Sequence, residues 1–194
     1  MEDKNAALLK LLTVAKRSTR LSEQLLDLAR LNAAIKAPVR SKADLSELVQ
    51  HVAQEFEISA VQNQRSIFLD VHSCSMKCNV DEIGILLRNL LDNAMRYTAE
   101  HGNIIVRCGY VSNDMGKVYL EVLDDGPGVD PAEQRAIFER FYRARQTPIR
   151  GSGIGLSLVA GIAELHDAII ETGTGLNDQG LKIRIVFPLS LIHI

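Results

Sequence analysis

Two asparagines, Asn89 and Asn93, stand four residues apart in a stretch whose apolar residues recur at helical spacing. In an α-helix this spacing places both carboxamides on the same face. Two amide oxygens on one face suit a hard cation such as Mg²⁺, which keeps several waters and binds substrate phosphates. Arg96 and Tyr97, one turn further on, offer a phosphate partner and a flat surface for a base or a ribose. Taken alone, the asparagine pair is better explained by solvated or capping side chains.

An acidic turn follows the strand that we expect over residues 117–123. Asp124 ends this strand, whose alternating valine and leucine side chains indicate burial, so its carboxylate requires a hydrogen-bond donor. The exocyclic amine of adenine is such a donor, whereas guanine carries a carbonyl at the equivalent position. Gly126 and Gly128 leave room for a base and permit positive φ angles. An Asp-Gly-Pro-Gly turn between a strand and a helix explains the same residues without a ligand.

A glycine-rich turn opens the helix that we expect over residues 153–166. It consists of Gly151, Ser152, Gly153, Ile154, Gly155 and Leu156. Backbone N–H groups at the start of a helix can hold a phosphate group. A dinucleotide-binding turn would require a glycine at position 156 and a strand before the turn, and the sequence has neither. The chain also has no Gly-Lys-Ser/Thr sequence, which excludes a P-loop.

The elements that must position these residues alternate irregularly between helix and strand. Hydrophobic spacing predicts a helix that starts at Asp81 and further helices over 5–37, 45–61, 131–138 and 153–166. It predicts strands over 66–71, 103–111, 117–123, 168–171 and 181–187. Residues 141–150 are polar and non-periodic, which predicts a loop. This order favours an α/β fold, a two-layer α/β sandwich with a mixed, mostly antiparallel sheet packed on helices.

The first expected helix, over residues 5–37, carries one apolar stripe and a polar opposite face. A helix of this length must bury its stripe, and a second helix in a bundle or coiled coil is the expected partner. The alternative is a helix folded back on its own domain. Pro38 ends the helix, because the residue before a proline is biased out of the helical region.

Composition limits the function classes. The chain has 194 residues, 46% of them hydrophobic, and a formal net charge of −2, so no bulk attraction to nucleic acid or anionic lipid is expected. Its three cysteines, Cys74, Cys78 and Cys108, form no disulfide framework and indicate a reducing compartment. Cys74 and Cys78 with His72 fit no common zinc spacing. No apolar run is long enough to span a membrane, and no signal peptide is evident.

Together, the three motifs resemble those of the sensor histidine kinases of bacterial two-component systems. Residues 87–97 are similar to their N box, 124–128 to the G1 box, 138–143 to the F box and 151–156 to the G2 box. The resemblance covers residues 45–188. The segment 22–31 resembles the second helix of the dimerisation hairpin of these kinases.

This resemblance implies a Bergerat ATP-binding fold preceded by one long dimerisation helix, with ATP and Mg²⁺ as cofactors. It implies that Asn89 and Asn93 hold Mg²⁺, that Asp124 binds adenine, that Tyr97 packs on the base and that residues 141–150 form a lid over the phosphates. The implied ATP-binding residues are Asn89, Asn93, Arg96, Tyr97, Asp124, Gly126, Gly128, Val129, Phe138, Arg140, Arg143, Gly151, Ser152, Gly153, Gly155 and Leu156.

The chain departs from the family pattern in three places. The acceptor motif His-Glu/Asp-Leu-Arg-x-Pro is absent, because other residues follow the histidines that could begin it: His51, His72, His101 and His166. We therefore expect no catalytic acceptor residue here, and a chain that binds ATP but does not phosphorylate itself. Leu181 stands where many relatives have threonine near the purine. The lid after Arg143 is short.

We therefore expect an incomplete dimerisation hairpin over residues 1–37 and a kinase catalytic domain over 38–188. Residues 189–194 match the translation of a sequencing adapter, so we expect an artefactual tail. The expected partners are a second copy of the protein, an acceptor histidine helix and a response regulator receiver domain, but no nucleic acid. The expected location is the cytoplasmic side of a bacterial inner-membrane protein, anchored by segments absent here. Alternatives are a degenerate, non-catalytic nucleotide-binding or dimerisation module and an anti-sigma-type serine kinase.

Overall fold

The computed structural model describes residues 11, 14–15, 18–19, 21–29, 39–112, 114–144 and 152–189. The chain divides into two compact units, Met1–Lys36 and Ala37–Ile194. In the first unit, every described position between residues 11 and 29 is helical. This agrees with the helix predicted over 5–37, whose other residues lie outside the described part of the chain. Gly151 and residues 190–194 lie outside it as well. No helix among the described residues is both long enough and apolar enough to cross a membrane.

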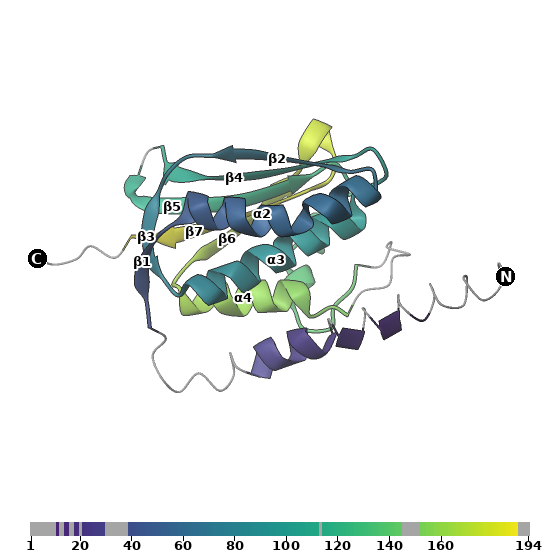
Figure 1. The fold of residues 1–194 in the computed structure, drawn as a ribbon, viewed down its shortest axis with the longest axis horizontal. Helices are drawn as coiled ribbons and strands as arrows, with labels where there is room; N and C mark the ends of the chain where they lie inside the picture. The colour runs from purple at the N-terminus through teal and green to yellow at the C-terminus, as the bar shows by residue number, and fades with distance from the viewer. Residues whose placement is uncertain are drawn as a thin grey trace, which may run out of the picture. The chain divides into compact units, whose positions relative to one another are not determined.

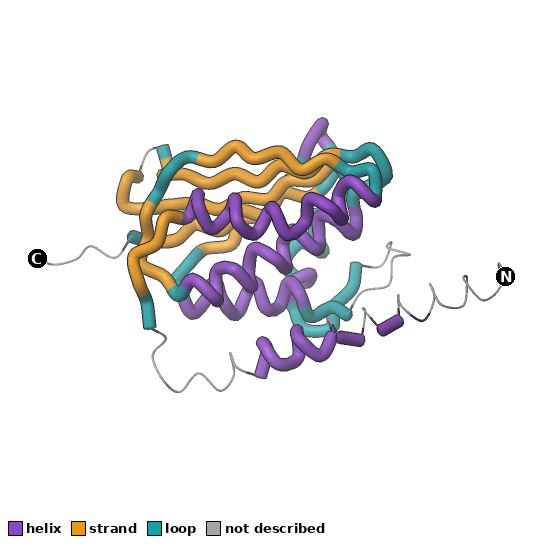
Figure 2. Tube along the Cα trace, in the orientation of Figure 1, coloured by secondary structure: helices purple, strands orange, loops and turns teal. Residues whose placement is uncertain are grey.

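The second unit has two layers (Figures 1 and 2). One layer is a five-stranded sheet in the order β2-β4-β5-β7-β6. Its strands are β2 Ser66–Val71, β4 Asn103–Val111, β5 Asp114–Asp124, β7 Leu181–Pro188 and β6 Ile169–Thr174. The β2–β4 pair is parallel and the other three pairs are antiparallel. The second layer consists of three helices on one face of the sheet: α2 Leu45–Gln62, α3 Val80–Tyr97 and α4 Gly155–Leu165. The predicted α/β sandwich is therefore confirmed.

Side-chain caps determine where two of these helices begin. Asp44 precedes α2, and its carboxylate accepts a hydrogen bond of 2.8 Å from the backbone N–H of Ser46. Asn79 precedes α3 and accepts from the N–H groups of Asp81 and Glu82, at 3.0 and 3.3 Å. Such caps satisfy N–H groups that have no partner within the helix. Behind the Asn79 cap, α3 buries one apolar stripe formed by Ile83, Leu86, Leu87, Leu90 and Leu91.

One small sheet was not predicted from the sequence, and one predicted helix is absent from the structure. A small antiparallel sheet of β1 Ser41–Asp44 and β3 Ser75–Cys78 was not predicted, because its strands have four residues each and no clear alternation. The helix predicted over 131–138 is reduced to a 3-10 turn, η1 Ala136–Phe138. Asp130 explains the shortening, because its side chain accepts from the N–H of Ala132 and its carbonyl from the N–H of Glu133. These bonds favour a turn over the start of an α-helix.

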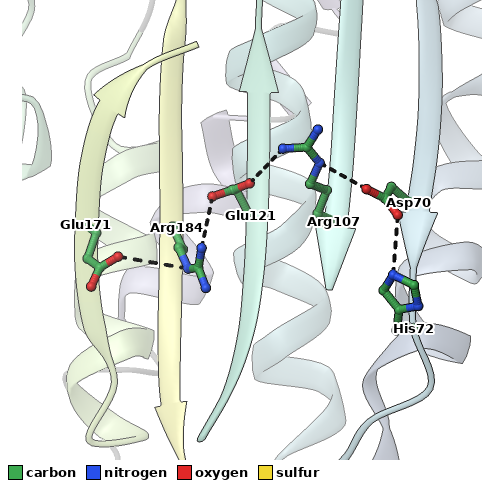
Figure 3. A network of polar contacts seen from close by, with 6 residues as sticks. All are labelled: Asp70, His72, Arg107, Glu121, Glu171 and Arg184. Carbon is green, nitrogen blue, oxygen red and sulfur yellow. Dashed lines mark hydrogen bonds and ion pairs between the residues drawn. The ribbon is translucent and has the colours of Figure 1, made fainter. Parts of the chain in front are cut away.

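The face of the sheet opposite the helices carries a row of charged side chains that crosses all five strands (Figure 3). We call this row the charge ladder; it consists of Asp70, Arg107, Glu121, Arg184 and Glu171. Neighbouring strands place these residues directly opposite one another. The successive N–O distances across the ladder are 3.2, 3.5, 3.6 and 3.9 Å. Glu121, at its centre, is only 4% exposed.

Candidate functional site

The predicted site residues come from four segments that meet at one end of the two helices α3 and α4. The C-terminal half of α3 supplies Asn89, Asn93, Arg96 and Tyr97. The end of β5 supplies Asp124, and the turn after it packs on α3 so closely that a Cβ at Gly126 would lie 2.9 Å from the carbonyl oxygen of Tyr97. The turn before α4 contacts the F box, because the N–H of Phe141 donates to the carbonyl of Gly153 at 2.9 Å.

Asp124 is the electrostatic centre of this arrangement. The residue is only 4% exposed. Its Oδ1 accepts hydrogen bonds from the backbone N–H groups of Gly126 and Leu181, at 2.9 and 3.2 Å. Burial raises the pKa of this carboxyl to about 6, and the two backbone bonds oppose the rise. Among the described residues, no hydrogen bond reaches Oδ2. A carboxylate in this state favours a ligand that brings an N–H donor.

Glycines allow the backbone to pack tightly around Asp124. A Cβ at Gly180, where φ is +76°, would lie 1.9 Å from the carbonyl oxygen of Asp124, and one at Gly175 would lie 2.1 Å from it. Gly128 has a φ of +73°, as predicted, and a Cβ there would lie 2.7 Å from the carbonyl of Gly180. Gly126 is needed for space and not for a positive φ. Sequence reasoning missed Gly175 and Gly180, which lie in the turn between β6 and β7.

The asparagine pair lies on α3 as the spacing predicts. Asn89 is 7% exposed, and its Nδ2 donates to the carbonyl of Ile85 at 2.8 Å. This bond orients the amide so that the side-chain oxygen is the atom suited to a cation. Asn93 lies one helical turn further along and is half-buried, as are Arg96 and Tyr97. No group of three or more His, Cys, Asp or Glu residues that could hold a metal occurs in the part of the chain that the structure describes.

The F box and the segment before it form a turn anchored on the sheet. Tyr142 donates its hydroxyl to Glu133 at 2.6 Å, and Thr172 of β6 donates to Gln134 at 2.8 Å. Gln134 in turn donates to the carbonyl of Val129 at 3.4 Å. Phe138 is half-buried, whereas Arg140 and Arg143 are exposed where the predicted lid begins. Lid residues 145–150 lie outside the described residues.

The start of α4 is shaped for close backbone approach. Gly153 has a φ of +70°, and a Cβ there would lie 2.7 Å from the backbone of Phe141. The Ser152 hydroxyl accepts from the N–H of Ile154 at 3.3 Å, and α4 begins at Gly155, followed by half-buried Leu156. The first N–H groups of an α-helix have no partner within the helix and carry partial positive charge. This end of α4 can therefore bind a phosphate group.

Comparison of the sequence with known protein families identifies the family of this chain. The model of the family described as "Histidine kinase-, DNA gyrase B-, and HSP90-like ATPase" matches residues 78–191. The chain belongs to this family. The match includes α3, the Asp124 turn and the start of α4, so the prediction of an ATP-binding domain is confirmed.

Two similar proteins are named as sensor proteins. The chain is 35% identical over 193 residues to "Sensor protein kinase PmrB" of Pseudomonas aeruginosa, with 96% of this chain and 39% of that protein covered. It is 35% identical over 176 residues to "Sensor protein QseC" of Escherichia coli K12, with 90% and 37% covered. The chain thus spans less than two fifths of the length of these relatives. The solved "Mycobacterial sensor histidine kinase MprB" superposes with a TM-score of 0.68 at 25% identity, with 77% of this chain and 97% of that chain covered.

These comparisons confirm that the chain is a histidine kinase ATPase domain of the sensor kinase type. They also confirm the fold class, since the solved catalytic domains share the α/β arrangement. The roles of the individual site residues and the binding of Mg²⁺ stay predictions.

Proposed function

We propose that this domain binds Mg²⁺·ATP and transfers the γ-phosphoryl group to a histidine on a dimerisation helix, for relay to an aspartate of a response regulator. The observation that carries this proposal is the buried carboxylate of Asp124 beside the end of α3. A buried carboxylate with a raised pKa is an unfavourable feature for a purely structural turn, and it is explained by a ligand that donates to it.

In this proposal Asp124 selects the base. The backbone N–H groups of Gly126 and Leu181 orient Oδ1 and keep the carboxyl group in place. Oδ2 accepts from the exocyclic amine of adenine. A guanine base would present a carbonyl oxygen to the carboxylate, and the repulsion between the two acceptors would exclude it.

Asn89 and Asn93 would hold Mg²⁺ through their amide oxygens, and the bond from Asn89 to Ile85 fixes the first of these amides. When bound, Mg²⁺ neutralises phosphate charge and orients the γ-phosphoryl group. The start of α4, with Gly153 and Gly155, would hold the phosphates through backbone N–H groups. Arg96, Arg140 and Arg143 are the candidate side-chain contacts to phosphate.

Partners and location follow from the same proposal. The helix in residues 1–37 would pair with a second copy of the protein, and the acceptor histidine would come from a helix of the same or the sister subunit. A receiver domain of a response regulator would accept the phosphoryl group. The domain would act on the cytoplasmic side of an inner-membrane protein.

Calorimetric titration of the purified chain with a non-hydrolysable ATP analogue, with and without Mg²⁺, tests the proposal. We expect Mg²⁺-dependent binding, and no binding of the matching GTP analogue. A second step supplies an acceptor helix in trans together with ATP and looks for phosphohistidine. Equal affinity for the two analogues would contradict the assignment of Asp124. An absence of binding to either would favour the alternative, a non-catalytic module.

A further inference from the structure

His166 lies at the end of the helix pair opposite the candidate site. α3 and α4 pack side by side and run antiparallel (Figure 1). The asparagine pair of α3 and the start of α4 are at one end, and Asn79 and His166 are at the other. α4 has 11 residues, which corresponds to a length of about 16 Å. A contact at the His166 end therefore joins the two helices about one length of α4 away from the site.

The imidazole of His166 joins the two helices directly. Its Nε2 accepts a hydrogen bond of 3.3 Å from the backbone N–H of Asn79, the residue that caps α3. Its Nδ1 lies 3.0 Å from the carbonyl oxygen of Ile162 within α4. A backbone N–H can only donate and a carbonyl can only accept. The two contacts therefore require a neutral ring with its proton on Nδ1.

The surroundings of the ring restrain it further. His166 is 4% exposed, and its ring stands at 89° to the ring of Phe187 of β7, with the centroids 6.3 Å apart. Arg40 donates to the carbonyl of Leu165, the last residue of α4. The charged groups that face the ring are Glu82 of α3, Arg40, which precedes β1, and Asp167, which follows His166. Oε2 of Glu82 lies 3.6 Å from Nε2, farther away than the N–H of Asn79. Burial is the largest influence on the ring and lowers its pKa, in agreement with the neutral form that the contacts require.

We propose that His166 is a positioning residue for the nucleotide site: its neutral imidazole holds the capped start of α3 against the end of α4, and so fixes the α3 asparagines relative to the phosphate-binding start of α4. This inference rests on the proposed function. A histidine that only filled space would need no acceptor at Nε2, because its apolar packing is independent of the proton position.

Two substitutions separate these roles. In His166→Gln, the side-chain amide reaches the position of Nε2 and can still accept from the N–H of Asn79. In His166→Asn, the shorter amide reaches only the position of Nδ1, so the contact between the helices is lost. Both variants lose the aromatic contact with Phe187. His51→Asn, on the exposed face of α2, is the matched control for replacing a histidine by asparagine.

The first measurement needs no nucleotide. Nitrogen-15 spectra of the imidazole should show the proton of His166 on Nδ1, and a proton on Nε2 at neutral pH would overturn the proposal. Hydrogen exchange of the Asn79 amide should be about tenfold faster in His166→Asn, as expected for the loss of one hydrogen bond. It should be close to wild type in His166→Gln and in His51→Asn. Equal exchange in wild type and His166→Asn would also refute the proposed contact between His166 and Asn79.

The second measurement tests the link to the site. Titration of His166→Asn with Mg²⁺ and a non-hydrolysable ATP analogue should show affinity reduced about tenfold, a typical loss when a group that orients metal ligands is removed. Affinity for adenosine, which lacks phosphates, should stay at the wild-type value. A parallel loss for both ligands would assign His166 a general structural role. If the wild type bound no ATP analogue, the proposed function would fail. The exchange result would still decide whether His166 joins the two helices through Asn79.

Discussion

Replacing Asp124 by asparagine is expected to weaken ATP binding and, at neutral pH, to stabilise the free domain. Asparagine keeps the shape of the side chain and an oxygen that can accept from the N–H groups of Gly126 and Leu181. The change removes the charge and places an NH₂ group toward the ligand. The two effects have opposite signs because the same carboxylate is costly to bury and useful for binding.

The stability effect follows from the raised pKa. The carboxyl titrates near 3.8 in the unfolded chain and at about 6 in the folded one, so the folded state prefers the protonated form. Its stabilising contribution is complete below the unfolded value and is lost as the pH rises through about 6. A difference of about 2 pKa units corresponds to ~3 kcal/mol at pH 7.5. A buried NH₂ group without a partner costs about 1–3 kcal/mol, so we expect a net gain of at most ~2 kcal/mol.

Urea denaturation of wild type and Asp124→Asn at several values between pH 4 and pH 8 measures this gain. The difference in unfolding free energy should shift in favour of the variant as the pH rises through about 6. Asp114→Asn is the control of opposite sign, because a hydrogen bond from Lys117 lowers the pKa of Asp114. That variant should be less stable than wild type by a constant amount between pH 4 and pH 8, because the lowered pKa of Asp114 stabilises the wild type fully above the ordinary carboxyl value of 3.8. A pH-independent difference for Asp124→Asn would refute the electrostatic reasoning.

Titration of the same variant with the ATP analogue measures the binding effect. The amide NH₂ would face the amine of adenine, and a mispaired buried polar group costs about 1–3 kcal/mol. In the wild type, affinity should fall as the pH is lowered through about 6, because protonation of Asp124 removes the acceptor. The variant should lack this pH dependence. Unchanged ATP affinity in Asp124→Asn would rule out the assigned role.

Three further predictions concern the metal ligands, the charge ladder and the glycines. Asn93→Ala should reduce the affinity for ATP in the presence of Mg²⁺ about tenfold and leave Mg²⁺-free binding unchanged. Titration with and without Mg²⁺ measures both affinities, and an equal loss in the two conditions would contradict the prediction. Glu121→Ala should lower the unfolding free energy by ~3 kcal/mol, because Arg107 and Arg184 lose their shared partner. A loss below about 1 kcal/mol in urea denaturation would contradict this and mean that water solvates both arginines adequately. Gly180→Ala should destabilise the domain by more than ~3 kcal/mol, because its Cβ would overlap the backbone of Asp124. Gly84→Ala is the control at a helical position where only the end of Arg88 must move, and it should raise the unfolding free energy by about 0.5–1 kcal/mol. Thermal unfolding that ranks the two variants alike would refute this.

The sequence predicted the elements with strong local patterns. β2 and β4 were predicted with their observed bounds, Ser66–Val71 and Asn103–Val111, because their apolar residues lie between clear turn residues. α3 was predicted because its apolar stripe is long. The segment before η1 was wrongly predicted as helix, because the local bonds of Asp130 compete with helical ones. The four-residue strands β1 and β3 have too little pattern to be recognised.

Site features that depend on distant segments could not be predicted from local pattern. The N–H of Leu181 meets Asp124 across 57 residues of chain, and Gly175 and Gly180 matter only because their turn packs on the backbone of Asp124. The helix predicted over residues 153–166 ends at His166, which follows the last residue of α4. The bond of His166 to Asn79 spans 87 residues and required the tertiary fold.

The alternating signs of the charge ladder also affect how two sheets could meet. The sheet has five strands, an odd number, so a row that alternates in sign ends with the same sign at both edges. Asp70 of β2 and Glu171 of β6 are these two ends. If a second molecule extended the sheet in this row at either edge, a carboxylate would face another carboxylate, whichever edges were joined. Like charges directly opposite each other disfavour strand pairing, so the row protects both open edges against unlimited edge-to-edge assembly.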